Sequence, residues 1–133
     1  MAEGLLEYAS KEWCERAVEV WNETVVPNLV DPEHYHYTVE FGETASGKFS
    51  QLNTEYGKVL TWEPGKHIEE ECDFVIWATP EIYEKIGEGK LDPVGAVASK
   101  RVHVRRGPMP VIIKEADAFK KLLIGLGQIP TAW

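Results

Sequence analysis

The stretch of this sequence that most resembles a catalytic motif is GEGKLDP, residues 87–93, because a glycine pair followed by lysine is typical of phosphate-binding loops. Such a loop requires another glycine five positions before the second one, a serine or threonine after the lysine, and a preceding strand. Here these positions hold Glu84 and Leu91, and the preceding segment has a helical pattern. We therefore interpret Gly87 as the C-terminal glycine of one helix and Asp92-Pro93 as the start of another.

The histidines are the next candidates for chemistry. His34 and His36 are spaced as on one face of a strand, so a metal ion could be bound by this pair together with His67 or Glu40. A pair of histidines two residues apart is more typical of a solvated polar strand face. The sequence therefore predicts no metal site.

The remaining nucleophiles lack partners of the right kind. Cys14 has Glu12 and Glu15 beside it, and acidic neighbours raise the pKa of a thiol, which is the opposite of activation. Ser99 has no Gly-x-Ser-x-Gly context. Cys14 and Cys72 fit no zinc spacing, and no export signal precedes them, so we predict two reduced thiols in a cytoplasmic protein. We predict neither an enzyme nor a cofactor.

The distribution of charge excludes one class of partner. The chain of 133 residues has a net charge of −8, and residues 1–43 contain ten acidic residues against Lys11 and Arg16. Binding to nucleic acid needs a coherent basic surface, so we exclude nucleic acid. No run approaches the roughly 18–20 apolar residues of a membrane span. The length predicts a single domain over 1–133.

Hydrophobic periodicity predicts the elements that position these residues. Apolar residues at three- and four-residue steps predict amphipathic helices over 4–26 and 110–124, while alternation predicts strands over 35–41, 48–56, 59–62 and 101–105. The apolar run in 72–78 predicts a strand buried on both faces, and Thr79-Pro80 predicts a helix N-terminus before 81–86. A further short helix is expected over 91–99. The fold class is α+β around one antiparallel sheet.

The order of motifs from Cys72 onward resembles the sterol-carrier-protein lipid-binding domain. The resemblance rests on Asp73 and the strand Phe74-Val75-Ile76, the connection Gly89-Lys90-Leu91-Asp92-Pro93, the small residues Gly95-Ala96, the basic strand Arg101-Val102-His103-Val104-Arg105, and the closing amphipathic helix. It covers about the last 60 residues. The first 70 agree in element order only. Val97, where the family often has an aromatic residue, and Lys100, where it has a glycine, depart from the pattern.

This resemblance implies a fold and a function. The expected fold is a five-stranded, largely antiparallel sheet covered by helices, with an apolar tunnel or cavity between sheet and helices. The expected function is non-enzymatic binding or transfer of a fatty acid, fatty acyl-CoA, phospholipid or sterol. We expect the tunnel to be lined by Phe74, Ile76, Trp77, Leu91, Val97, Ile112, Phe119, Leu123 and Leu126. From the residues alone, the surplus of aliphatic side chains in the last helix equally fits ordinary core or a dimer contact.

A basic cluster follows the small-residue helix. Lys100, Arg101, Arg105 and Arg106 could hold a carboxylate, a coenzyme A phosphate or an anionic membrane surface, with Arg101 and Arg105 as headgroup contacts. Alternatively they are the solvated face of an edge strand, where charge discourages aggregation. The alternative function is an accessory subunit that uses the same apolar groove to bind a protein partner or to form a homodimer.

Overall fold

The structure is a computed structural model that describes residues 4–65 and 72–133. Its main sheet has five strands in the order β4-β3-β2-β5-β6. These are β2 (Thr38–Glu43), β3 (Phe49–Glu55), β4 (Lys58–Pro64), β5 (Phe74–Ala78) and β6 (His103–Arg106). The β2–β5 pair is parallel and the other three pairs are antiparallel. The predicted α+β class and largely antiparallel five-stranded sheet are confirmed, and β2, β3 and β4 correspond to the strands predicted over 35–41, 48–56 and 59–62.

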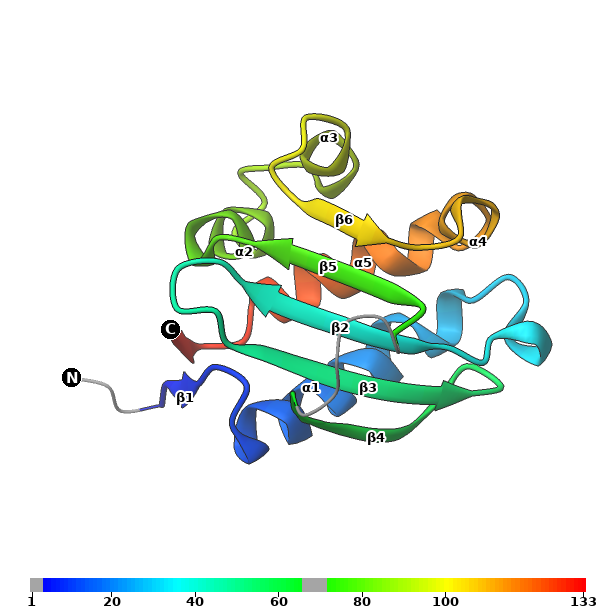
Figure 1. The fold of residues 1–133 in the computed structure, drawn as a ribbon, viewed down its shortest axis with the longest axis horizontal. Helices are drawn as coiled ribbons and strands as arrows, with labels where there is room; N and C mark the ends of the chain where they lie inside the picture. Colours follow the sequence, from blue (N-terminus) through cyan, green and yellow to red (C-terminus); the bar gives the residue numbers. More distant parts are fainter. Residues whose placement is uncertain (1–3, 66–71) are drawn as a thin grey trace.

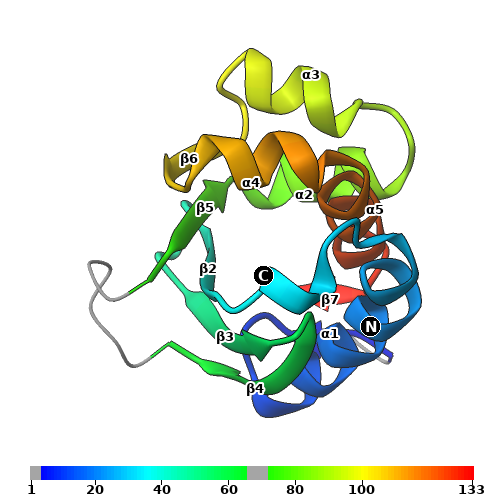
Figure 2. The same ribbon diagram turned by 90° about the vertical axis from the view of Figure 1, so that its right-hand side faces the viewer.

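The helices gather on one side of this sheet, as Figures 1 and 2 show. They are α1 (Lys11–Thr24), α2 (Pro80–Gly87), α3 (Pro93–Ala98), α4 (Met109–Lys114) and α5 (Ala116–Gly127), with 3-10 turns η1 (Val26–Asn28) and η2 (Pro32–His34) after α1. The cap signals were correctly located. The side chains of Thr79 and Asp92 accept hydrogen bonds from the backbone N–H groups of Ile82 and Gly95.

The first predicted helix begins later than expected. Residues Leu6–Glu7 form β1, which pairs in parallel with β7 (Thr131–Ala132) near the other end of the chain. The helix starts only after Ser10, whose hydroxyl accepts a hydrogen bond from the Trp13 N–H group. Ala9, with φ of 61°, separates strand from helix. The apolar spacing could not reveal this pair, because its partner is more than 120 residues away.

The last predicted helix is two helices. It breaks at Glu115, whose φ of −101° and ψ of 22° lie outside the helical region. The Glu115 side chain is fully buried and turns toward residues 30 and 31, so a tertiary contact overrides a continuous helical pattern. As a result, α4 and α5 can lie at an angle and enclose space.

The core lies between the sheet and the helices. Trp13 and Trp21 of α1, Trp62 of β4 and Phe41 of β2 are buried there. Strand β5 is buried on both faces, as predicted: Phe74 and Ile76 face this core, while Val75 and Trp77 form a second cluster with Cys72 on the opposite face.

Candidate functional site

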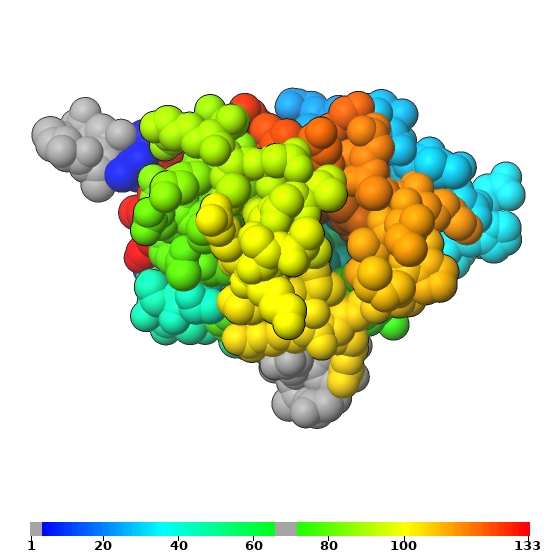
Figure 3. Space-filling view, turned by 90° about the horizontal axis from the view of Figure 1, so that it is seen from above, coloured from blue at the N-terminus to red at the C-terminus, as the bar shows by residue number. Residues whose placement is uncertain are grey.

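An apolar groove of about 350 Å³ opens between α3, α4 and α5. Figure 3 shows this face of the molecule hollowed between the yellow-green residues of α3 and the orange residues of α4 and α5. The groove is lined by Pro93, Val94, Val97, Ala98, Ile112, Ile113, Ala116, Phe119, Lys120 and Leu123. Its volume and apolar lining are typical of sites that bind small hydrophobic molecules.

Short helical repeats place these side chains. On α3, Val94, Val97 and Ala98 are three and four residues apart, so they share one face of the helix. On α5, Phe119 and Leu123 follow the same rule, and both lie in the groove. The groove therefore lies between two apolar helix faces, and Ile112 and Ile113 of α4 complete its lining. Its lining residues come from the helices, so the apolar space lies among helices rather than against the sheet.

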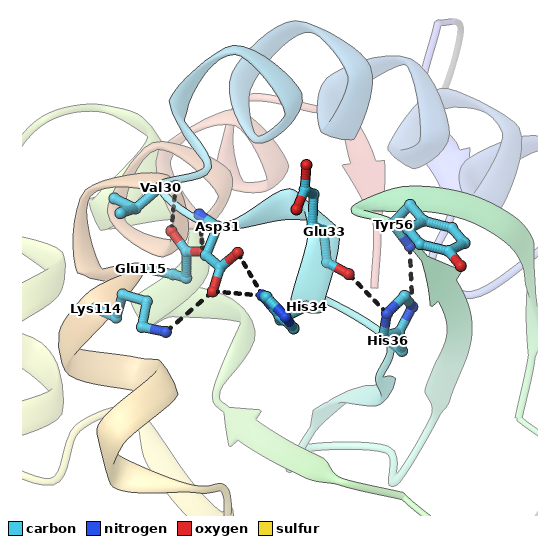
Figure 4. A network of polar contacts seen from close by, with 8 residues as sticks. All are labelled: Val30, Asp31, Glu33, His34, His36, Tyr56, Lys114 and Glu115. Atoms are coloured by element: carbon cyan, nitrogen blue, oxygen red, sulfur yellow. Dashed lines mark hydrogen bonds and ion pairs between the residues drawn. The ribbon is translucent and has the colours of Figure 1, made fainter.

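Glu115 anchors the helix pair α4–α5 to the rest of the protein. Its buried carboxylate accepts hydrogen bonds from the backbone N–H groups of Val30, at 2.6 Å, and Asp31, at 3.0 Å. The Asp31 carboxylate contacts Lys114 Nζ at 3.2 Å and His34 Nδ1 at 2.8 Å, as Figure 4 shows. These contacts fix the end of α4 beside the groove, so the groove's shape depends on this polar network.

The lining of the groove carries little charge. Lys120 is the one charged residue in its lining, and its ammonium lies 3.8 Å from the carboxylate of Asp92. Both side chains are about half exposed, so this ion pair contributes little stability. Lys120 could therefore exchange its weak ion pair with Asp92 for a contact with an anionic group at the groove.

Four of the nine residues predicted to line an apolar site are brought together in this groove: Val97, Ile112, Phe119 and Leu123. Phe74 lies directly behind them, with its ring centroid 5.5 Å from that of Phe119. Ile76 is on the core face of the same strand. These six residues form one continuous apolar region from the surface to the sheet.

The other three lie elsewhere. Leu91 packs against the main core but does not line the groove. Leu126 is buried at the far end of α5, beside Tyr83 and Trp133. Trp77 lies on the opposite face of the sheet, where its indole N–H donates a hydrogen bond to Glu40 at 2.7 Å. The period of two within β5 puts Phe74 and Trp77 on different faces, so a strand buried on both faces cannot supply both to one site.

The two predicted headgroup arginines are separated. The guanidinium of Arg105 lies 4.6 Å from the ring centroid of Trp77, which places it over the opposite face of the sheet. Arg101 is exposed and follows the groove residue Ala98 by three positions. Of the two, only Arg101 is close in sequence to the groove.

Sequence reasoning missed several lining residues. Val94, Ala98 and Ala116 were seen only as helix residues, although each is close in the helical repeat to a predicted lining residue. Lys120 was missed because only the apolar residues of this helix were considered as lining. It lies four residues after Ala116 and three before Leu123, so a helical wheel centred on these two would have included it.

The candidates for metal binding and catalysis are engaged in other contacts. His36 Nε2 contacts the Glu33 carbonyl at 2.9 Å and its Nδ1 accepts a hydrogen bond from the Tyr56 N–H group at 3.2 Å (Figure 4). Within residues 4–65 and 72–133, no group of three or more histidine, cysteine, aspartate or glutamate side chains could hold a metal ion. His67 lies outside the described residues.

The cysteines agree with their predicted inert state. Both thiols are buried. Burial, with Glu63 and Glu15 adding to it, raises the pKa of the Cys14 thiol to about 12, in the direction predicted from its acidic neighbours. The Ser99 hydroxyl donates a hydrogen bond to the Ala96 carbonyl at 3.3 Å, as expected of a residue at a helix end. No helix among the described residues is long and apolar enough to cross a membrane.

Comparison with known proteins connects this geometry to a fold. No family model matches the chain, and no curated protein matches it. Solved structures do match. A crystal structure of sterol carrier protein 2 has a TM-score of 0.75 at 17% sequence identity, covering 92% of this chain and 99% of that one. A conserved hypothetical protein from Thermus thermophilus, described as possibly sterol carrier protein, has a TM-score of 0.71 at 16% identity, covering 95% and 92%.

A third structure carries a ligand. The solution structure of sterol carrier protein-2 from Aedes aegypti in complex with the C16 fatty acid palmitate has a TM-score of 0.52 at 15% identity, covering 85% of this chain and 96% of that one. Identities this low show a shared fold, and the matches extend over nearly the whole of each chain. This chain therefore has the fold of sterol carrier protein 2.

Proposed function

We propose that this protein binds a long-chain lipid in the groove between α3, α4 and α5, without carrying out chemistry on it. The observation that carries the proposal is the groove's lining, in which nine apolar residues and Lys120 surround about 350 Å³. Exposed apolar surface is costly unless something covers it. The palmitate bound by the Aedes aegypti protein of the same fold supports a fatty chain as the occupant.

The energetics fit a reversible carrier. At ~0.8 kcal/mol per buried methylene, a chain of about 16 carbons gains on the order of 10–12 kcal/mol. Association and ordering cost about 4–15 kcal/mol. The balance allows affinities around the micromolar range without any specific polar contact. Specificity then depends on the length of the groove and on few polar groups.

Lys120 is the best placed contact for an anionic headgroup at the outer end of the groove, and Arg101 is a second candidate. Lys120 lines the groove, and the ion pair described for it is with the exposed Asp92. Arg105 is a weaker candidate, because its guanidinium lies over Trp77 on the other face of the sheet. The carboxylate of a fatty acid or a phosphate of an acyl-CoA could form a charged hydrogen bond with Lys120 at this end of the groove.

The alternative occupant is a protein partner or a second copy of the chain. It is favoured by three apolar side chains around the groove, Val94, Met109 and Ile113, which are 57%, 59% and 70% exposed. Such residues suit an interface as well as a lipid entrance.

Native mass spectrometry of the freshly purified protein, followed by organic extraction, tests the proposal. A lipid-binding protein should be monomeric and carry a fatty acid, phospholipid or sterol that the extract identifies. A lipid-free dimer, with no displacement of a fluorescent fatty acid at micromolar concentrations, would favour the interface instead.

A further inference from the structure

The hydroxyl group of Tyr35 is buried without a hydrogen-bond partner. The residue is 1% exposed, and its Oη atom has no hydrogen-bond partner among the described residues. Two other buried tyrosines show the normal arrangement: Tyr8 Oη donates to the Phe41 carbonyl at 2.9 Å, and Tyr83 Oη to the Gly42 carbonyl at 2.8 Å. A buried polar group without a partner is unfavourable, and it points to a missing one.

Tyr35 packs against a residue that lines the apolar groove. Its ring centroid is 6.3 Å from that of Phe119, a half-buried residue that lines the groove, and 4.8 Å from that of Tyr37. Phe74, which also contacts Phe119, completes the aromatic group. Phe119 thus lines the groove and also packs against the Tyr35 ring.

The charges around Tyr35 restrict what could bind there. Burial raises the pKa of Tyr35, and the carboxylates of Glu115 and Asp73 raise it further, so the phenol stays protonated and can donate a hydrogen bond. The same two carboxylates would repel an anionic group brought to this position. The Glu115 carboxylate accepts hydrogen bonds from the N–H groups of Val30 and Asp31. Moving it away from Tyr35 would break these hydrogen bonds.

We propose that the Tyr35 hydroxyl is the inner polar subsite of the groove and donates a hydrogen bond to the neutral oxygen of a lipid that enters polar end first. The ligand class is a long-chain or polycyclic lipid with an alcohol, ketone or ester oxygen. Phe119 moves aside to admit it. An anionic fatty acid binds in the reverse direction, with its carboxylate outside near Lys120. This inference rests on the proposed function and specifies its ligand.

A pair of ligands that differ in one functional group tests the subsite. Binding of 1-dodecanol and dodecanoate is measured by displacement of a fluorescent fatty acid from the parent and from Tyr35→Phe. The variant should bind dodecanol about tenfold more weakly, the loss of one buried hydrogen bond, and dodecanoate with unchanged affinity. Equal dodecanol affinity in both proteins, or an equal loss for both ligands, would overturn the subsite while leaving lipid binding intact. A parent that binds neither ligand would overturn lipid binding itself.

Thermal unfolding of the ligand-free proteins supplies the control. Tyr35→Phe should be at least as stable as the parent, because it removes a buried hydroxyl that has no partner. Tyr8→Phe removes a hydroxyl that has one, so it should lower the Tm and leave the ratio of the two ligand affinities unchanged. A Tm loss in Tyr35→Phe equal to that in Tyr8→Phe would show that the Tyr35 hydroxyl has a structural partner, and would contradict the proposal.

Discussion

Gly87 at the end of α2 and Gly127 at the end of α5 pack backbone against backbone. A Cβ atom on Gly127 would lie 2.2 Å from the Tyr83 carbonyl oxygen, and one on Gly87 would lie 2.3 Å from the Gly127 carbonyl carbon. The sequence predicted Gly87 as the C-terminal glycine of this helix, and α2 does end there. The φ of Gly87 is not positive, and the positive φ occurs at Gly89 instead. Close approach of two helices, and not backbone conformation, requires glycine at position 87.

Gly127→Ala should therefore destabilise the protein by about 1–3 kcal/mol or more, because neither backbone can move aside. Gly95→Ala is the matched control. It lies within α3, where a Cβ would be 3.6 Å from the nearest atom, so helix propensity should raise stability by about 0.5–1 kcal/mol. Urea unfolding measures both. Equal stability of Gly127→Ala and the parent would contradict the close packing.

The buried carboxylate of Glu115 is expected to stabilise the α4–α5 junction through its two hydrogen bonds to the chain at Val30 and Asp31. Glu115→Ala should cost about 2–3 kcal/mol, and Glu115→Gln about half of that, since the amide oxygen keeps one acceptor. Glu33→Ala is the control, because Glu33 takes part in the network only through its backbone carbonyl. Its free energy of unfolding should change by less than about 0.5 kcal/mol.

Acid should weaken the part of this network that depends on the Asp31 carboxylate. The imidazole of His34, followed by the ammonium of Lys114, lowers the pKa of the Asp31 carboxyl. A lowered pKa stabilises the folded state above the unfolded pKa of about 3.9, and this contribution disappears as pH falls through the folded value. Asp31→Asn should thus be less stable than the parent at pH 7, and the difference should shrink as pH falls below the unfolded pKa of about 3.9. A difference that stays constant over this range would contradict the assignment.

The cysteine thiols should be unreactive in the native state. With the Cys14 pKa raised to about 12 and Cys72 buried, few thiolates are accessible at pH 8. An aromatic disulfide reagent should therefore react only at the rate of unfolding, and in denaturant it should modify two thiols per chain. Rapid modification of either thiol in the folded protein would show that the site is open to solvent.

Local signals in the sequence predicted the parts of the fold that depend on neighbouring residues. Asp92 and Thr79 were recognised as N-caps because the hydrogen bonds they accept come from three residues away. The double burial of β5 was visible in its unbroken apolar run. By contrast, the β1–β7 pair and the helix break at Glu115 depend on contacts with residues more than 80 positions away. No local pattern could reveal them.

In the candidate site too, local spacing was predictable from the sequence and long-range contacts were not. Helical spacing placed Ile112, Phe119 and Leu123 on one stripe, and in the structure they line the groove together with Val97. It could not place Trp77, because an apolar run does not say which face a given residue occupies in a strand buried on both sides. It also gave no indication that Tyr35 packs against Phe119, since that contact joins segments 84 residues apart.

The most direct test of the account is a titration of a fluorescent fatty acid against the parent protein, Ala98→Trp and Ala45→Trp. Ala98 lines the groove and is exposed, so a tryptophan there should fill the groove without opening a cavity in the core. Ala45 is also exposed, in the turn after β2 and outside the groove lining. The account predicts micromolar binding to the parent and to Ala45→Trp, and at least about tenfold weaker binding to Ala98→Trp, a difference of about 1.4 kcal/mol. Equal affinity in all three proteins, or no binding to the parent, would contradict it.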